Sequence, residues 1–193
     1  MIALGEAYEF AFRGLLCEEA LDRSGRRPRT LADQANVGLA LAVSLDVLDE
    51  AAVEEAKAMS VVFTAIAAFE NSVRRLITTI LRDEVGEAWW DTCASDRIRK
   101  RAEARREEEA AAKWHAQRGV HPLYFTDLGD LAAIIQQNWD RFDPHIRSAE
   151  WAKGLLSSVE RSRNVIMHGG TLAIEDVERV GMNIRDWVRQ VGA

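Results

Sequence analysis

The chain has little proline, little cysteine and no long hydrophobic run. It contains three prolines and two cysteines in 193 residues. Cys17 and Cys93 are too few for a disulfide framework and form no C-x-x-C metal pair, so we expect a reducing compartment. The longest apolar stretch, from Met59 to Phe69, is 11 residues, well short of the roughly 20 that cross a bilayer. The N-terminus does not read as a secretory signal, and we predict a cytoplasmic protein with no membrane partner.

An excess of positive charge is also lacking. Lys and Arg number 25 against 31 Asp and Glu, which gives a net charge of −6 and a pI near 5.3. This balance argues against broad, nonspecific adhesion to nucleic acid, so any RNA contact must be local. His115, His121 and His145 have no helical metal-ligand spacing, so we expect no metal site.

Helix-forming residues fill the rest of the chain, and apolar positions recur at helical spacing. The sequence therefore predicts an all-α fold with one proper core. Gly119 and Pro122 predict a loop over residues 117–125, and Asp143 followed by Pro144 is typical of a helix start. The expected helices cover approximately residues 2–21, 31–48, 51–84, 95–115, 126–139, 149–168 and 174–191.

Two of these helices carry a charge on their apolar face. Residues 51–84 contain one continuous apolar stripe, formed by Met59, Phe63, Ile66, Phe69, Val73, Ile77 and Ile80. Glu70 projects from the middle of the stripe, and Arg74 lies on its edge one turn later. An unpaired carboxylate in the core would cost several kcal/mol, so Glu70 needs a cation.

The helix at 149–168 shows the complementary anomaly. Its stripe consists of Trp151, Ala152, Leu155, Leu156, Val159, Ile166 and Met167. Arg163 lies among these residues, which predicts a Glu70–Arg163 pair at the rim of the core with Arg74 nearby. Such a pair serves either packing or chemistry, and helical phase alone does not distinguish the two.

His168 follows Arg163 by five residues, near the end of the same helix, and shares a helix face with Asn164. Gly169 and Gly170 come next and allow close approach of a substrate or another chain. A single histidine in such a place is more often structural or merely exposed than functional.

The run Arg161-Ser-Arg-Asn-Val-Ile-Met-His168 contains R-N-x-x-x-H. It resembles the R-x(4–6)-H motif of the HEPN superfamily, with Arg163 as its arginine. Phe69-Glu70-x-x-x-Arg74 resembles the E-x-x-x-K/R element of active members. The segment Tyr124–Phe142 resembles one HEPN branch that occurs alone and fused to other nuclease or defence modules. The resemblance covers residues 59–193, and we expect residues 1–58 to form a helical extension packed on that bundle.

The resemblance implies an up-and-down helical bundle that pairs as a homodimer and cleaves single-stranded RNA without a metal or any other cofactor. His168 would be the acid/base and Arg163 the clamp on the phosphate, supported by Asn164, Glu70 and Arg74. Many HEPN proteins are toxins or antiviral effectors, and a neutralising protein is a further implied partner. In toxins neutralised by nucleotide transfer a tyrosine stands two residues after the histidine. Gly170 occupies that position here, so this control is not available to the chain.

Two other interpretations of the sequence stay open. HEPN modules that have lost activity serve as dimerisation or RNA-binding scaffolds, and a plain helical partner-binding domain would make the motif match accidental. The complete set of motif residues favours the enzyme, because a scaffold has no need of a polar histidine beside a buried ion pair.

The helix at 95–115 is basic early and acidic late. Arg99 and Arg101 could belong to a positive rail for RNA phosphates. The alternative is a solvated helix with pairs such as Arg99–Glu103 and Arg105–Glu109. The six tryptophans could stack bases, but packing in the core or the dimer interface is the more common role.

Overall fold

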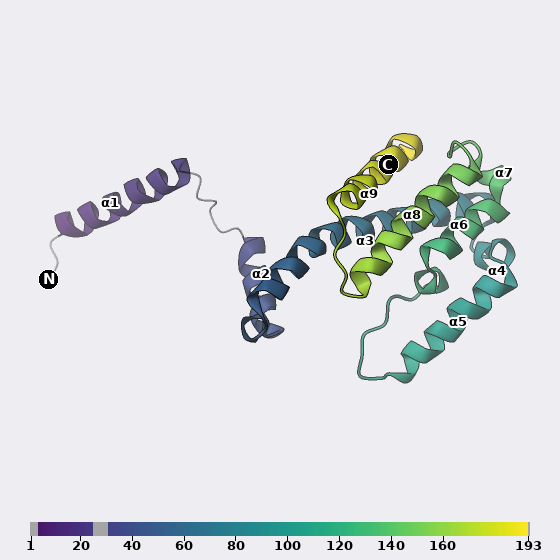
Figure 1. The fold of residues 1–193 in the computed structure, drawn as a ribbon, viewed down its shortest axis with the longest axis horizontal. Coiled ribbons are helices and arrows are strands. Elements are labelled where there is room, and N and C mark those ends of the chain that lie inside the picture. The colour runs from purple at the N-terminus through teal and green to yellow at the C-terminus, as the bar shows by residue number, and fades with distance from the viewer. Residues whose placement is uncertain (1–3, 25–30, 193) are drawn as a thin grey trace. The chain divides into compact units, whose positions relative to one another are not determined.

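The computed structural model describes residues 4–24 and 31–192, so the expected helix start at Ile2 lies outside the described residues. The chain divides into two compact units, Met1–Val53 and Glu54–Ala193. The first unit contains α1 (Leu4–Arg23), α2 (Leu31–Ala42) and the 3-10 turn η1 (Leu45–Val47) (Figure 1). The predicted helix at 31–48 is wrong beyond Ala42, because Ser44 adopts a left-handed conformation with φ 55°.

The second unit begins within the long helix α3 (Glu50–Val85), close to the predicted 51–84. The predicted all-α fold is confirmed, since every regular element of the described residues is helical. The remaining elements are α4 (Trp89–Cys93), α5 (Asp96–Ala111), the 3-10 turn η2 (Pro122–Phe125), α6 (Leu128–Gln137), α7 (Trp139–Phe142), α8 (Ala149–Met167) and α9 (Ile174–Val191). In the described parts of the chain no helix is long and apolar enough to cross a bilayer.

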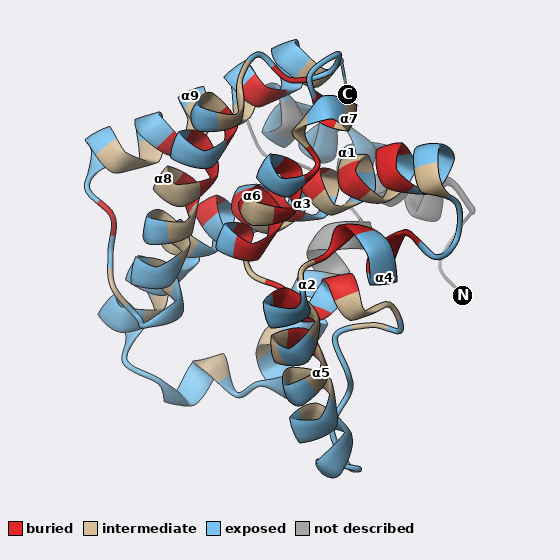
Figure 2. Cartoon of the chain, turned by 90° about the vertical axis from the view of Figure 1, so that its right-hand side faces the viewer, coloured by how far each residue is buried: buried red, intermediate tan, exposed pale blue. Residues whose placement is uncertain are grey.

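The buried core of the described residues lies within the second unit (Figure 2). α8 packs against α6 on one side and α9 on another. The rings of Phe69 on α3 and Trp187 on α9 meet edge to face at 5.8 Å, and both are buried. Two positions of the predicted stripes are not core positions, because Phe63 is 37% exposed and Met167 is 55% exposed.

The chain between α6 and α8 differs from the prediction at two points. The expected helix at 126–139 is interrupted at Asn138, whose side-chain Nδ2 donates to the Cys93 carbonyl at 2.9 Å and to the Ile134 carbonyl at 2.8 Å. The Asp143–Pro144 pair does not start a helix. Asp143 ends α7, and Ser148 caps α8 by accepting a hydrogen bond from the Trp151 N–H at 3.0 Å.

The tryptophans are mostly packing residues, as the sequence predicts. Trp89 and Trp187 are buried, and Trp139 and Trp151 pack partly buried against the core. Trp114 is the exception, since it is 87% exposed and lies outside the core.

Candidate active site

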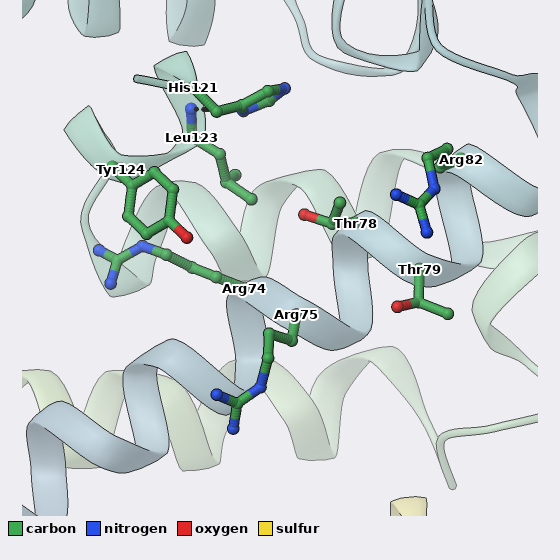
Figure 3. A pocket seen from close by; sticks show the side chains of 8 residues that line it. All are labelled: Arg74, Arg75, Thr78, Thr79, Arg82, His121, Leu123 and Tyr124. Carbon is green, nitrogen blue, oxygen red and sulfur yellow. Dashed lines mark hydrogen bonds between the residues drawn. The ribbon is translucent and has the colours of Figure 1, made fainter. Parts of the chain in front are cut away.

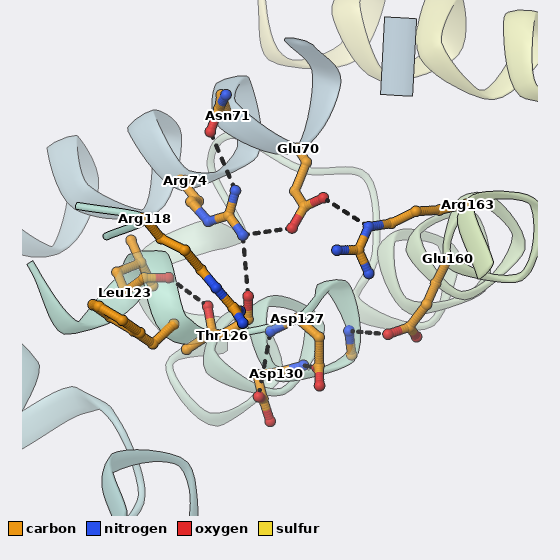
Figure 4. Close-up of polar contacts among 12 residues, drawn as sticks. Glu70, Asn71, Arg74, Arg118, Leu123, Thr126, Asp127, Asp130, Glu160 and Arg163 are labelled. Carbon is orange, nitrogen blue, oxygen red and sulfur yellow. Dashed lines mark hydrogen bonds and ion pairs between the residues drawn. The ribbon is translucent and has the colours of Figure 1, made fainter. Parts of the chain in front are cut away.

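A buried carboxylate joins α3 to α8. Glu70 is 6% exposed, and its Oε1 lies 2.5 Å from Nη2 of Arg74. Its Oε2 lies 3.5 Å from Nε of Arg163 (Figure 4). The predicted pairing of Glu70 with Arg163, with Arg74 nearby, is confirmed. Arg74 makes the shorter contact, so it is the closer partner of the carboxylate.

Arg74 is held from several sides. Nη2 also donates to the carbonyl of Thr126 at 3.0 Å, and Nη1 donates to the side-chain oxygen of Asn71 at 3.2 Å. Its Nε is buried and has no hydrogen-bond partner among the described residues. Arg74 therefore ties Glu70 to the segment that leads into α6, and its guanidinium is largely committed to the protein.

Arg163 is held on one side only. Its side chain is 30% exposed, and Glu70 is its ion-pair partner. Within residues 4–24 and 31–192, no ion pair or hydrogen bond involves its two terminal nitrogens. A guanidinium with both terminal nitrogens available can bind two oxygens of a phosphate or carboxylate at once. The Arg163 guanidinium is thus held in place through Nε, while its two terminal nitrogens remain available to bind two oxygens of a ligand.

The start of α6 adds a second set of charges that the sequence analysis missed. Asp127 caps the helix by accepting the Asp130 N–H at 2.8 Å, and the Asp130 side chain accepts the Asp127 N–H in return. Arg105 of α5 lies 3.0 Å from the Asp127 carboxylate, and Arg101 lies 3.0 Å from that of Asp130. The D-x-x-D spacing before an apolar run was the available signal for this capping box.

The pKa values of the Asp127 and Asp130 carboxyl groups are shifted in opposite directions. Burial and the charge of Asp127 raise the pKa of Asp130 above its ordinary value. Burial also acts to raise the pKa of Asp127, but the hydrogen bond from the Asp130 N–H and the Arg105 guanidinium outweigh it and bring the value below normal. Of the two carboxyl groups, Asp127 therefore carries the negative charge more readily.

Glu160 lies one turn before Arg163 on α8 and accepts the Gly129 N–H of α6 at 3.4 Å (Figure 4). Burial and the negative charge of Asp127 raise its pKa, whereas the Gly129 hydrogen bond and Arg163 act to lower it. Glu160 is therefore a second carboxylate in the field of Arg163. Its spacing of three residues from Arg163 was the sequence signal for it.

Glu160→Gln is expected to become progressively more stable relative to the natural chain as pH rises from about 4 to about 7. The folded-state pKa of Glu160 is raised, so the protonated carboxyl favours folding below the unfolded pKa. That contribution is lost as pH rises through the folded pKa, and glutamine mimics the protonated form at every pH. Urea unfolding at both pH values measures the effect. An identical stability difference at the two pH values would contradict it.

Asn164 and His168 are both exposed and lie at the end of α8. His168 is the C-cap residue, and its backbone N–H donates to the Asn164 carbonyl at 3.2 Å. Within the described residues no side-chain hydrogen bond or ion pair joins either residue to the Glu70 cluster. The structure thus brings together Glu70, Arg74 and Arg163, and it leaves Asn164 and His168 facing solvent.

The two glycines after His168 shape the end of α8. Gly169 has φ +76°, a left-handed conformation that favours glycine. The Gly170 N–H donates to the Val165 carbonyl at 2.9 Å, and a Cβ at Gly170 would lie only 2.8 Å from the Val165 side chain. Their local role is to turn the chain sharply, which sets His168 at the point where the helix stops.

The family model described as Swt1-like HEPN matches residues 64–192, about two thirds of the chain. The chain belongs to the HEPN family. Glu70, Arg74, Arg163 and His168 all lie within the matched region of this HEPN protein. HEPN domains are often ribonucleases, and they often bind RNA and dimerise. No curated protein and no solved structure gave a significant match.

The arginines of α5 in this HEPN domain make contacts different from those predicted. The expected Arg99–Glu103 and Arg105–Glu109 pairs are wrong. Arg99 pairs with Asp96, and Arg101 and Arg105 bind the carboxylates at the start of α6. These contacts between α5 and α6 are favoured over pairs within α5 because they neutralise the carboxylate of Asp130, whose side chain is 3% exposed. RNA binding by Arg99 and Arg101 stays a prediction.

The described residues contain no group of three or more His, Cys, Asp and Glu side chains arranged to hold a metal ion.

Proposed function

We propose that this HEPN protein is an endoribonuclease that cleaves single-stranded RNA without a metal ion. The proposal depends on the guanidinium of Arg163. Its Nε pairs with buried Glu70, and its two terminal nitrogens make no ion pair or hydrogen bond with the described residues. Such a group supplies fixed positive charge at the point where a phosphorane-like transition state gains negative charge. Glu70 and Arg74 position it, and exposed Asn164 binds a phosphate oxygen.

The reaction needs proton transfers that histidine performs close to neutral pH. His168 takes the proton of a ribose 2′-OH, the 2′-oxygen forms a bond to phosphorus, and the bond from phosphorus to the 5′-oxygen breaks. The leaving 5′-oxygen receives a proton from a second imidazole, which the partner subunit's His168 provides in a homodimer. The products are a 2′,3′-cyclic phosphate and a 5′-hydroxyl, and DNA is spared because it lacks the nucleophile.

A homodimer in which two copies of α8 border one cleft supplies both imidazoles. A nuclease of this kind suits the role of a toxin or defence effector, and such an enzyme needs a neutralising partner while the cell is healthy. RNA, a second copy of the chain and that protein are the partners we propose.

The test is cleavage of diverse single-stranded RNAs by the full chain in EDTA, with analysis of the new ends. We expect cyclic phosphate and 5′-hydroxyl ends. A matched substrate with one 2′-deoxynucleotide at the cleaved position should resist at that position alone. Absence of cleavage in every RNA, or products with 3′-hydroxyl ends, would contradict the proposal.

One observation favours a second candidate, a catalytically inactive HEPN scaffold for dimerisation or RNA binding. The imidazole of His168 is exposed, and no side-chain hydrogen bond orients it within the described residues. A scaffold would bind RNA or its partner with unchanged affinity after His168→Ala and would release no RNA fragments.

A further inference from the structure

A pocket of about 290 Å³ lies beside the Glu70–Arg74 pair, between the last turns of α3 and the η2 segment (Figure 3). Its volume lies just below the ligand-pocket range of about 300–1,000 Å³, so it has room for only a short part of a longer strand. Its polar lining consists chiefly of Arg74, Arg75, Thr78, Arg82, His121 and Tyr124, and it includes no Asp or Glu.

The positive charge of this pocket comes mainly from Arg75 and Arg82. Both are exposed, and neither makes an ion pair or hydrogen bond with any residue of the described ranges. They lie seven residues apart on one side of α3, which separates their Cα atoms by about 10.5 Å along the helix axis. Arg74 at the inner end is already neutralised by Glu70. The chain is acidic overall, but no Asp or Glu lies among the residues that line this pocket.

The opposite wall contributes a fixed neutral donor. Nδ1 of His121 accepts the Leu123 N–H at 3.1 Å, so the ring hydrogen of the neutral form is on Nε2. The imidazole stacks on Trp89, with ring centroids 5.2 Å apart and planes 14° from parallel. Burial lowers the pKa of His121, and the nearby charge of Glu87 acts in the opposite direction. His121 therefore offers a hydrogen-bond donor without adding a charge.

Tyr124 completes the pocket. The residue is 42% exposed, and its ring centroid lies 5.9 Å from the Arg74 guanidinium carbon. Figure 3 shows its hydroxyl pointing toward α3. Gly119 lies directly behind the ring, where a Cβ would come within 2.9 Å of it. The glycine thus permits the close packing that holds this aromatic group at the pocket.

We propose that this pocket binds phosphate groups of the RNA strand, with Arg75 and Arg82 as the phosphate contacts and Tyr124 beside the ribose or base. Exposed arginines with an adjacent aromatic ring are the combination that binds single strands without reading their sequence. The inference rests on the proposed function, because it adds a second place at which the proposed RNA substrate contacts the protein, apart from Arg163.

Binding of a 2′-O-methyl oligonucleotide tests the inference independently of cleavage, because that strand lacks the nucleophile. Arg75→Glu/Arg82→Glu in the full chain should weaken binding by at least about tenfold and reduce the salt dependence by about two phosphate contacts. The matched control is Arg147→Glu/Arg189→Glu, which makes the same charge change at two exposed arginines outside the pocket. We expect a clearly smaller loss from the control.

Inorganic phosphate and AMP serve as further probes. They should compete only weakly, since neither spans the two arginines. Equal weakening by the pocket and control variants, or binding of AMP as tight as that of the strand, would overturn the inference. If the pocket variant binds the strand normally while the natural chain still cleaves RNA, the inference fails and the proposed function stands. If the natural chain binds the strand at the pocket but does not cleave RNA, the proposed function fails and the inference stands.

Discussion

Replacing His168 with alanine is expected to lower the rate of RNA cleavage by about 10²–10⁴-fold, the usual contribution of a general acid or base. The imidazole is exposed at the end of α8 and makes no side-chain hydrogen bond within the described residues. Its removal should therefore leave the free energy of unfolding almost unchanged. Single-turnover cleavage of a labelled RNA, together with urea unfolding, separates the two effects.

His145→Ala is the matched control for this experiment. His145 is also exposed but lies in the segment between α7 and α8, outside the motif. It should retain full activity. If His168→Ala cleaves as fast as the natural chain, His168 is not the acid or base of the reaction.

Replacing Glu70 with alanine is expected to destabilise the fold by about 3–5 kcal/mol, the cost of removing one partner of a buried ion pair. Glu70 is 6% exposed, and it balances Arg74 and Arg163 at once. Without the carboxylate, the Arg74 guanidinium would remain in the core with its charge uncompensated. Urea unfolding measures the loss, and the double variant Glu70→Ala/Arg74→Ala should lose less than the sum of the single variants.

The exposed pair of Glu54 and Lys57, 2.7 Å apart, supplies the comparison. Glu54→Ala should cost less than about 1 kcal/mol, because solvent screens an exposed pair. If Glu70→Ala is no more harmful than Glu54→Ala, the buried pair does not stabilise the bundle.

The central pair could be predicted because its charges violate helical amphipathicity. Glu70 and Arg163 each occupy an apolar face, and two such faces that pack together must bring their charges into contact. Helical phase does not determine side-chain rotamers, however. It placed Arg74 only on the edge of the stripe, whereas the long side chain reaches the carboxylate more closely than Arg163 does.

The network at the start of α6 could not be predicted in the same way. Within α5 the sequence offers Arg105 a local partner, Glu109, at a spacing of four, and local spacing is all that a sequence pattern contains. Arg101 and Arg105 turn instead to carboxylates more than twenty residues away. The helix break at Asn138 has the same origin, because its amide contacts the Cys93 carbonyl of a distant helix.

Because Arg163 is held on one side only, the residues that balance charge in the core differ from the residue that is available to bind a ligand. The core charge is balanced within α3 by Glu70 and Arg74, whose side chains are 8% and 12% exposed, while Arg163 approaches from α8 with 30% of its side chain in solvent. A descendant that exchanged Arg163 for a neutral residue would keep its helical frame and give up only the bidentate charge. A ribonuclease and a catalytically inactive scaffold with this fold can therefore differ by one substitution.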